Sequence, residues 1–367
     1  MLAFISEDHK LFVSGNNYYG QLGLGHNYND NDNDDNNDDN NDNNDNIKNL
    51  NQVENFDNVT LVSYYYNHMA FINDDKLYTC GYNICGQLGL GYYNDVNIPK
   101  QVEGFNIVTS VSCGGYHTAF ISDEKLYTCG YNICGQLGLG HNIDVNSPNR
   151  VGNFNKVTSV SCGSVHTTFI NDGKLFVCGH NDYGQIGLGD HFDKTNVPIK
   201  LKNFNDVTSV SCGSHHTIFI NDNKLFACGF NLNGELGMQN DFCVIPTQIR
   251  GFDNVTSVSC GNHHTAFIDD GKLFVCGYNR DGQLGLGHVI NVNTPTQVEI
   301  LNDVTLLPVI KDFIGFVCDG KLYTSNHNLL KKLELKCGDH ISDFAEILDF
   351  KPLMPFKRFK RTKSARN

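Results

Sequence analysis

The sequence predicts an all-β protein that folds as a single closed β-propeller with seven blades. Three observations predict this fold. A unit of about 49 residues recurs along the chain, short runs of strand-forming residues alternate with turn residues, and the two chain ends carry complementary parts of one unit. Glycine is abundant, at 36 residues, and proline is scarce, at 8, which suits many tight turns between hydrogen-bonded strands.

The repeat is clearest in a Lys-Leu-aromatic sequence that occurs seven times. Its copies begin at Lys10, Lys76, Lys125, Lys174, Lys224, Lys272 and Lys321. The fullest unit contains Val-Thr-Ser-Val-Ser-Cys-Gly at 255–261, His-Thr-Ala-Phe-Ile at 264–268, Lys-Leu-Phe-Val-Cys-Gly at 272–277, Gly-Gln-Leu-Gly-Leu-Gly at 282–287 and a proline-containing segment at 295–298. The first three pieces are rich in β-branched and aromatic residues, which predicts strands.

Turn residues separate these strands. Asn-Asp-Gly at 171–173 and Asp-Asp-Gly at 269–271 accept the positive φ of tight hairpin turns, so consecutive strands should pair antiparallel. A four-stranded unit cannot bury both of its faces alone. Packing such sheets face to face around an axis solves this problem, and a straight solenoid is the rival arrangement.

The chain ends favour a ring over a straight solenoid. Residues 2–5 match 265–268, whereas residues 335–338 match 258–261, so the two ends supply different strands of one blade. We expect them to pair and thereby remove the free sheet edges. The seventh copy is degenerate, because Ile-Gly-Phe-Val at 314–317 replaces the usual His-Thr-x-Phe-Ile and Ser325-Asn326 replaces Cys-Gly.

We expect one propeller domain at 1–350 and a basic, disordered tail at 351–367. An insertion at 27–50 that contains little besides Asn and Asp should be disordered. The net charge is -13, and eight aspartates of this insertion supply much of it. An acidic body disfavours nucleic acid as a partner, and no apolar run is long enough to span a membrane. We expect a cytoplasmic protein, with the basic sequence at 357–363 as a candidate nuclear import signal.

The sequence Cys-Gly-x-x-His-Thr, followed by Lys-Leu-aromatic and then Gly-Gln-Leu-Gly-Leu-Gly, resembles the regulator of chromosome condensation repeat over roughly residues 1–340. The resemblance implies a seven-bladed propeller whose founding member exchanges guanine nucleotide on the GTPase Ran while docked on chromatin. Relatives serve as ubiquitin-ligase accessory domains, ciliary scaffolds or a plant ultraviolet photoreceptor. The chain has no Trp, which excludes that photoreceptor's chromophore.

Two rows of residues are candidate partner contacts. The repeat histidines are His117, His166, His216 and His264, and the residues immediately before them are Tyr116, Val165, His215 and His263. The resemblance places the histidines on a GTPase-facing surface, whereas a position repeated in every unit favours a bond that holds neighbouring blades together. The preceding residues vary between units, which favours a role in partner recognition.

The remaining motifs predict structure rather than chemistry. Fourteen cysteines invite a metal or disulfide hypothesis, but the Cys-x-x-x-His pairs fall one per unit and cannot converge on one ion, so we expect buried free thiols. The Gly-Gln-Leu-Gly-Leu-Gly segments precede no helix, which indicates turns rather than a phosphate site. We expect no catalytic residue, metal or cofactor. The sequence predicts a protein-interaction scaffold, and the alternative is a guanine nucleotide exchange factor for a small Ran-like GTPase.

Overall fold

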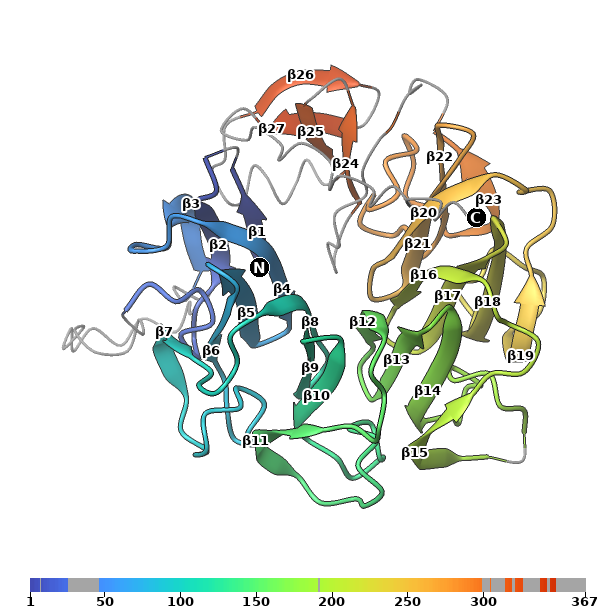
Figure 1. The fold of residues 1–367 in the computed structure, drawn as a ribbon. Helices are drawn as coiled ribbons and strands as arrows, with labels where there is room; N and C mark the ends of the chain where they lie inside the picture. The colour runs from blue at the N-terminus through green and yellow to red at the C-terminus, as the bar shows by residue number, and fades with distance from the viewer. Residues whose placement is uncertain are drawn as a thin grey trace, which may run out of the picture.

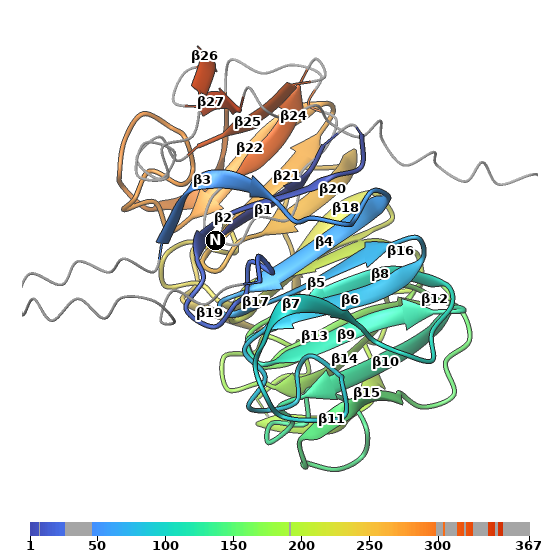
Figure 2. The same ribbon diagram turned by 90° about the vertical axis from the view of Figure 1, so that its left-hand side faces the viewer.

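The structure is a computed structural model that describes residues 1–6, 8–25, 46–190, 192–298, 304, 314–318, 321–325, 337–341 and 344–347. Within these residues the chain is all-β and contains no helix. The strands form one three-stranded sheet and six four-stranded sheets, which follow one another around an axis in Figure 1. Figure 2 shows the same sheets from the side. The prediction of an all-β repeat architecture is confirmed.

The sheets follow the order of the chain. The first contains β1 (Leu2–Ile5), β2 (Leu11–Asn16) and β3 (Asn46–Gln52), and the second β4 (Val59–Tyr65), β5 (His68–Asn73), β6 (Lys76–Gly81) and β7 (Val96–Gln101). The third contains β8 (Val108–Cys113), β9 (His117–Ser122), β10 (Lys125–Gly130) and β11 (Val145–Arg150), and the fourth β12 (Val157–Cys162), β13 (His166–Asn171), β14 (Lys174–His180) and β15 (Lys194–Lys200).

The remaining three sheets continue the pattern. The fifth contains β16 (Val207–Cys212), β17 (His216–Asn221), β18 (Lys224–Phe230) and β19 (Phe242–Gln248), and the sixth β20 (Val255–Cys260), β21 (His264–Asp269), β22 (Lys272–Gly277) and β23 (Val292–Gln297). The last contains β24 (Gly315–Cys318), β25 (Lys321–Thr324), β26 (Cys337–Ile341) and β27 (Phe344–Ile347), in the order β24-β25-β27-β26.

The hairpin turns form where the sequence predicts them. Asp172 and Gly173 have φ angles of 53° and 72°, and the flanking residues Asn171 and Lys174 pair directly. Two consecutive residues with positive φ twist a two-residue loop in the sense that antiparallel strands require. The second and third strands of each repeat are therefore joined by local turn chemistry.

Three of these turns, at 74–75, 123–124 and 222–223, lack the favourable glycine. Glu124 in the β9–β10 turn has a φ of 58°, which is strained for a residue with a side chain. We expect Glu124→Gly to raise the free energy of unfolding by about 1 kcal/mol. The reciprocal change, Gly173→Ala, should lower it, because a Cβ there would lie 2.8 Å from the Asn205 carbonyl oxygen. Urea unfolding of both variants measures the effect, and an unchanged midpoint for Glu124→Gly would contradict it.

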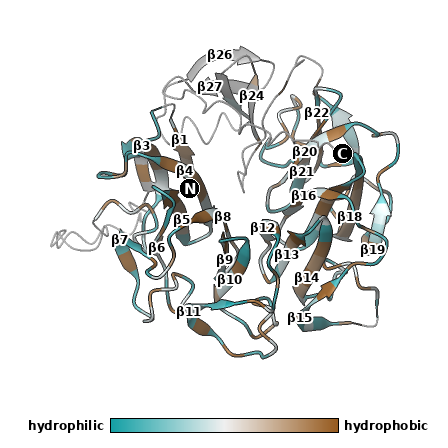
Figure 3. Ribbon diagram, in the orientation of Figure 1, coloured by the Kyte–Doolittle hydropathy of each residue, from teal (hydrophilic) through white to brown (hydrophobic). Residues whose placement is uncertain are grey.

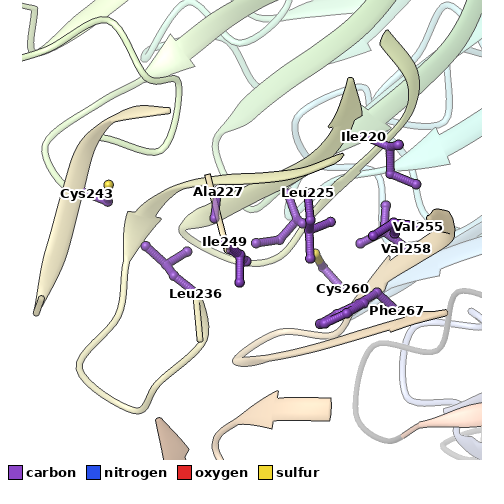
Figure 4. Packing of buried hydrophobic residues seen from close by; sticks show 11 residues of the cluster. Ile220, Leu225, Ala227, Leu236, Cys243, Ile249, Val255, Val258, Cys260 and Phe267 are labelled. Carbon is purple, nitrogen blue, oxygen red and sulfur yellow. The ribbon is translucent and has the colours of Figure 1, made fainter. Parts of the chain in front are cut away.

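The core lies between successive sheets. Figure 4 shows one such layer, in which Ile220, Leu225 and Ala227 of the fifth sheet pack against Val258 and Phe267 of the sixth. Brown stretches in Figure 3 mark hydrophobic residues along strands such as β14 and β18, and each buried cluster draws its side chains from two successive sheets. This burial supplies the main stabilising free energy and explains why the strands are apolar on both faces.

A tyrosine in the second sheet reaches across the axis. The Tyr65 hydroxyl lies 2.7 Å from Ser164 Oγ and 2.9 Å from Ser214 Oγ, in the fourth and fifth sheets. Tyr65 stands where the next unit has Gly114, and its side chain is completely buried. A straight solenoid would place these sheets too far apart for such bonds. These hydrogen bonds therefore exclude a straight solenoid and show that the sheets are arranged around an axis.

The chain ends differ from the prediction in two respects. The predicted insertion at 27–50 is ordered from residue 46, because β3 pairs with β2 and Ile47 packs on the core of the first sheet. The segment predicted to complete the first blade, 335–338, contributes Cys337 and Gly338 to β26, which pairs with β27 in the last sheet. Residues 27–45, the tail at 351–367 and Leu335-Lys336 lie outside the described residues.

Candidate functional site

The repeat histidines begin the second strand of their sheets. His117 pairs with Gly130, and His166 with Gly179, so each histidine lies beside the end of the third strand. His117, His166, His216 and His264 are all buried. They therefore present no side-chain surface to a partner in this structure, although the resemblance implies that they face one.

Three of these histidines, together with His68 at the same position of the second sheet, join neighbouring sheets. The distance from histidine Nε2 to the threonine Oγ1 of the next sheet is 2.9 Å for His117–Thr167, 3.0 Å for His166–Thr217, 3.2 Å for His216–Thr265 and 3.1 Å for His68–Thr118. In the fourth to fifth sheet contact, Thr217 donates its own proton to the Gln185 carbonyl at 2.7 Å. The hydroxyl oxygen must then accept from histidine Nε2–H. This chain of bonds gives the histidines a structural role.

The residues before the histidines are more accessible. Tyr116 and His263 are exposed, whereas Val165 and His215 are half-buried. All four lie at the edge where the second strand starts and the third strand ends, so they share one rim of the molecule. Contact with a partner through these four side chains stays a prediction.

A second row on the same rim was missed by the sequence reasoning. It consists of the residue after the buried asparagine in each loop between the third and fourth strands, and its members are Tyr18, Ile84, Ile133, Asp182, Leu232 and Arg280. Ile84 and Ile133 are 62% and 53% exposed. The signal was present in the sequence, because this position varies while the asparagine before it and the Gly-Gln or Gly-Glu after it recur. We call the two rows together the variable rim.

Aromatic contacts connect parts of the variable rim. The ring centroids of Tyr19 and Tyr82 lie 4.6 Å apart, those of Tyr82 and Tyr116 6.1 Å, and those of Tyr116 and Tyr131 6.4 Å. A row of tyrosines therefore runs over the first three sheets. Tyr183 and His215 lie 5.1 Å apart on the fourth and fifth sheets. Clusters of exposed aromatic and aliphatic side chains are typical of protein-binding surfaces.

The cysteines behave as core residues. The strand cysteines from Cys80 to Cys318 are buried and form no disulfide among the described residues, and Cys85 and Cys134 are half-buried. Cys162 illustrates their state: its backbone N–H donates to Ser112 Oγ of the preceding sheet at 2.9 Å, and burial raises the pKa of its thiol to about 12. Within the described ranges, His, Cys, Asp and Glu side chains form no group of three or more that could hold a metal ion. The prediction of core packing is confirmed for the strand cysteines.

The glycine-rich loops are turns that pack against the next sheet. Gly89 has a φ of 70°, and a Cβ there would lie 3.0 Å from Cys129 Sγ and 3.2 Å from the ring of Pro148. A side chain is thus excluded by backbone conformation and by close approach. Asn83 holds the same loop by accepting the Leu88 N–H at 3.0 Å. These contacts confirm that the glycines serve turns and packing.

Comparisons with known proteins identify the family. The sequence pattern described as "Regulator of chromosome condensation (RCC1) repeat" matches residues 74–121, 123–170, 172–220, 222–268 and 270–315. The chain belongs to the RCC1 repeat family. A second pattern with the same description matches 108–136, 207–235 and 255–283. No curated protein sequence matches this RCC1-repeat chain at a significant level.

Solved structures show the same fold. Human WBSCR16 superposes with a TM-score of 0.73 and 24% identity, covering 86% of this chain and 83% of its own. Yeast RCC1 (Prp20), solved bound to Kap60, gives a TM-score of 0.74 and 18% identity, covering 94% and 85%. Prp20p of Saccharomyces cerevisiae, described with its binding properties to Gsp1p and histones, gives 0.74 and 19%, covering 94% and 87%. At these identities the likeness concerns the fold alone.

Within the part of the chain that the structure describes, no helix has the length and apolar character needed to cross a bilayer.

Proposed function

We propose that this RCC1-repeat protein is a protein-interaction platform, built as a closed seven-bladed propeller, that binds its partner through the variable rim. The observation that carries the proposal is the contrast at that rim between a fixed frame and changing exposed residues. Buried Asn83 recurs in the first six repeats and buried Gln87 in five of them, whereas exposed Ile84 between them is replaced by Tyr, Asp, Leu or Arg elsewhere. A rigid scaffold that displays variable loop residues is the usual design of a binding surface.

Closure of the ring belongs to this proposal. Among the described residues, the first sheet has three strands and lacks the inner strand that the second to sixth sheets possess. The Lys-Leu-aromatic sequence occurs seven times, and the bonds of Tyr65 require the sheets to curve. A strand supplied from the C-terminal part of the chain would complete the first sheet and remove its free edge.

The test compares two variants at opposite edges of the sheets. Ile84→Glu combined with Ile133→Glu places charge on the variable rim, and Ile107→Glu places it at the opposite edge, where Ile107 is 50% exposed. After affinity purification from cells, we expect proteins that accompany the wild type and Ile107→Glu to be depleted about tenfold with the rim variant, because burying an unpaired charge opposes binding. Equal recovery with all three proteins contradicts the proposal.

The alternative function is guanine nucleotide exchange on a small Ran-like GTPase. Membership of the RCC1 family and the fold shared with Prp20p favour it. The burial of His117, His166, His216 and His264 removes the residues that motivated it from the accessible surface. Adding the purified protein to Ran loaded with a fluorescent guanine nucleotide tests this alternative. Faster nucleotide release supports exchange activity, and an unchanged rate eliminates it for Ran.

A further inference from the structure

One loop position departs from the repeat in the fifth sheet. Gln21, Gln87, Gln136, Gln185 and Gln283 occupy this position in the other repeats, and Glu235 occupies it here. Each glutamine accepts the backbone N–H of the residue two positions earlier, as Gln185 Oε1 does from Tyr183 at 3.0 Å. Glu235 preserves that bond, because its Oε2 accepts the Asn233 N–H at 2.9 Å. The fold therefore uses one oxygen that glutamine and glutamate share.

The rest of the glutamate carboxylate is different. In the first and fourth sheets the glutamine Nε2 bonds to Asn16 Oδ1 at 2.7 Å or to His180 Nδ1 at 3.0 Å. A carboxylate has no donor and accepts several hydrogen bonds. Glu235 Oε1 accepts one bond from Asn233 Nδ2 at 2.7 Å, so it retains capacity for a further donor.

The charge of Glu235 is buried without a cationic side chain. Its side chain is completely buried, and among the described residues no Lys or Arg nitrogen lies within 4 Å of its oxygens. The nearest ring nitrogen is His263 Nδ1, 3.7 Å from Oε1, on a side chain that is 46% exposed. Burying a carboxylate is costly unless a cation or several donors compensate. Among the described residues, no Lys or Arg side chain therefore supplies a positive charge to this carboxyl group.

His215 does not supply that charge at neutral pH. Burial lowers the pKa of His215, and the neighbouring His263 and His180 lower it further, against the opposite effect of Glu235. Its Nδ1 is buried and has no hydrogen-bond partner. The ring is therefore neutral above its ordinary pKa of about 6.5, and it lines the site beside an uncompensated carboxylate.

Aromatic rings lie next to the Glu235 loop. Tyr183 lies 5.4 Å from Phe230 and 6.0 Å from Phe242, and it contacts His215 at 5.1 Å. Phe230 occupies the position that Asn16 and His180 hold beside the loop glutamine, so these rings lie next to the Glu235 loop. Tyr183 and Phe242 are more than one-third exposed. Their faces attract a planar cation, and the carboxylate accepts two parallel N–H bonds from it.

We propose that the Glu235 site, formed by Glu235, His215, His263, Tyr183 and Phe230, binds an arginine side chain of a partner protein. The guanidinium group supplies the missing charge and donors, and it stacks on aromatic faces better than an ammonium group. The His263 ring lies 3.7 Å from the carboxylate and is 46% exposed, and in this proposal its rotation gives the guanidinium access on a fast timescale. The inference rests on the proposed platform function and specifies the chemistry of one of its contacts.

The first experiment measures binding of a single arginine without any partner. The probe is acetyl-Gly-Arg-Gly-amide, and its controls are the peptides with citrulline or lysine in place of arginine. Carbon-13 and proton resonances of the His215 and His263 rings report binding. We expect saturable shifts with arginine at millimolar concentration, the range of a single side-chain contact. Citrulline should give none, and lysine should bind several-fold more weakly. No saturable arginine shift, or equal shifts with citrulline, overturns the proposal, and equal lysine binding overturns the preference for a guanidinium.

The second experiment uses two matched variants. Glu235→Gln restores the residue of the other repeats and retains the accepting oxygen, so it should fold and melt at or above the wild-type temperature. It should weaken arginine binding about tenfold. Asp172→Asn removes an exposed carboxylate in a hairpin turn at the opposite edge of the sheets, 3.2 Å from Lys156, and it should change binding less than twofold. Wild-type affinity in Glu235→Gln, a lower melting temperature for it, or an equal loss in Asp172→Asn contradicts the site.

The two proposals fail separately. Suppose that the arginine peptide binds but the recovery of partner proteins is the same for the wild type and the Ile84→Glu, Ile133→Glu variant. The Glu235 site is then supported, and partner binding through that part of the variable rim is contradicted. If partner capture depends on those residues while no arginine shift appears, only the Glu235 site is wrong.

Discussion

Replacing Tyr65 with alanine should lower the free energy of unfolding by about 3–5 kcal/mol, one of the largest effects expected for any single side chain of this protein. Tyr65 is completely buried, and its hydroxyl bonds to Ser164 and Ser214, in two sheets that lie 99 and 149 residues further along the chain. Burial also raises the pKa of the phenol, which therefore stays protonated and available for these bonds. The substitution removes packing and both cross-axis bonds together.

Tyr65→Phe separates the two contributions. It keeps the ring and removes the hydroxyl, so buried Ser214 loses a partner, and we expect a loss of about 1–3 kcal/mol. Tyr92→Phe is the control, because Tyr92 is exposed and its change should stay within about 0.5 kcal/mol. Urea unfolding followed by tyrosine fluorescence measures all three variants. If Tyr65→Ala unfolds at the same urea concentration as Tyr92→Phe, the cross-axis bonds do not stabilise the fold.

The elements that the sequence predicted are those governed by local chemistry. The Asp172-Gly173 turn and the strands that flank it follow from residue types a few positions apart, and the repeat multiplies that local signal. The two interpretations of His117 were both open in the sequence, because a repeated histidine suits a partner surface as well as an interior bond. Its burial and its bond to Thr167 decide between them, and both depend on contacts about 50 residues away.

The features that escaped prediction are departures from the repeat. Tyr64-Tyr65-Tyr66 replaces the Cys-Gly-Gly of residues 113–115, and Glu235 replaces a glutamine, so both signals were visible in the sequence. The structural role of Tyr65 could not be predicted from the sequence, because its hydrogen-bond partners lie in sheets whose positions depend on the curvature of the whole array. The strand β3 escaped for a different reason: its apolar residues Ile47 and Leu50 are separated by Lys48 and Asn49 and do not alternate, so only packing on the first sheet reveals the strand.

Acid should destabilise the protein through His68. Burial lowers the pKa of this histidine from 6.5 in its ordinary state to about 4 in the folded protein. Its Nε2 lies 3.1 Å from Thr118 Oγ1, whose proton goes to the Gln87 carbonyl at 2.7 Å, so His68 is neutral and donates from Nε2. The unfolded chain binds a proton below about pH 6.5, whereas the folded chain resists it until about pH 4. Stability from His68 is therefore present above pH 6.5 and is lost as the pH falls toward 4.

The size of this loss and its test follow from the same linkage. A shift of this size corresponds to about 3 kcal/mol of unfolding free energy between pH 6.5 and pH 4. His68→Gln keeps an Nε2 donor for Thr118 and has no titratable ring, so its stability should fall less steeply with acid. Carboxylates and the other histidines, His215 among them, contribute to both proteins, and the difference between the two pH profiles isolates His68. Parallel profiles between pH 6.5 and pH 4 would contradict this prediction. They would show that His68 takes up its proton inside the folded protein and that the contact between His68 and Thr118, which joins the second and third sheets, tolerates a charged histidine.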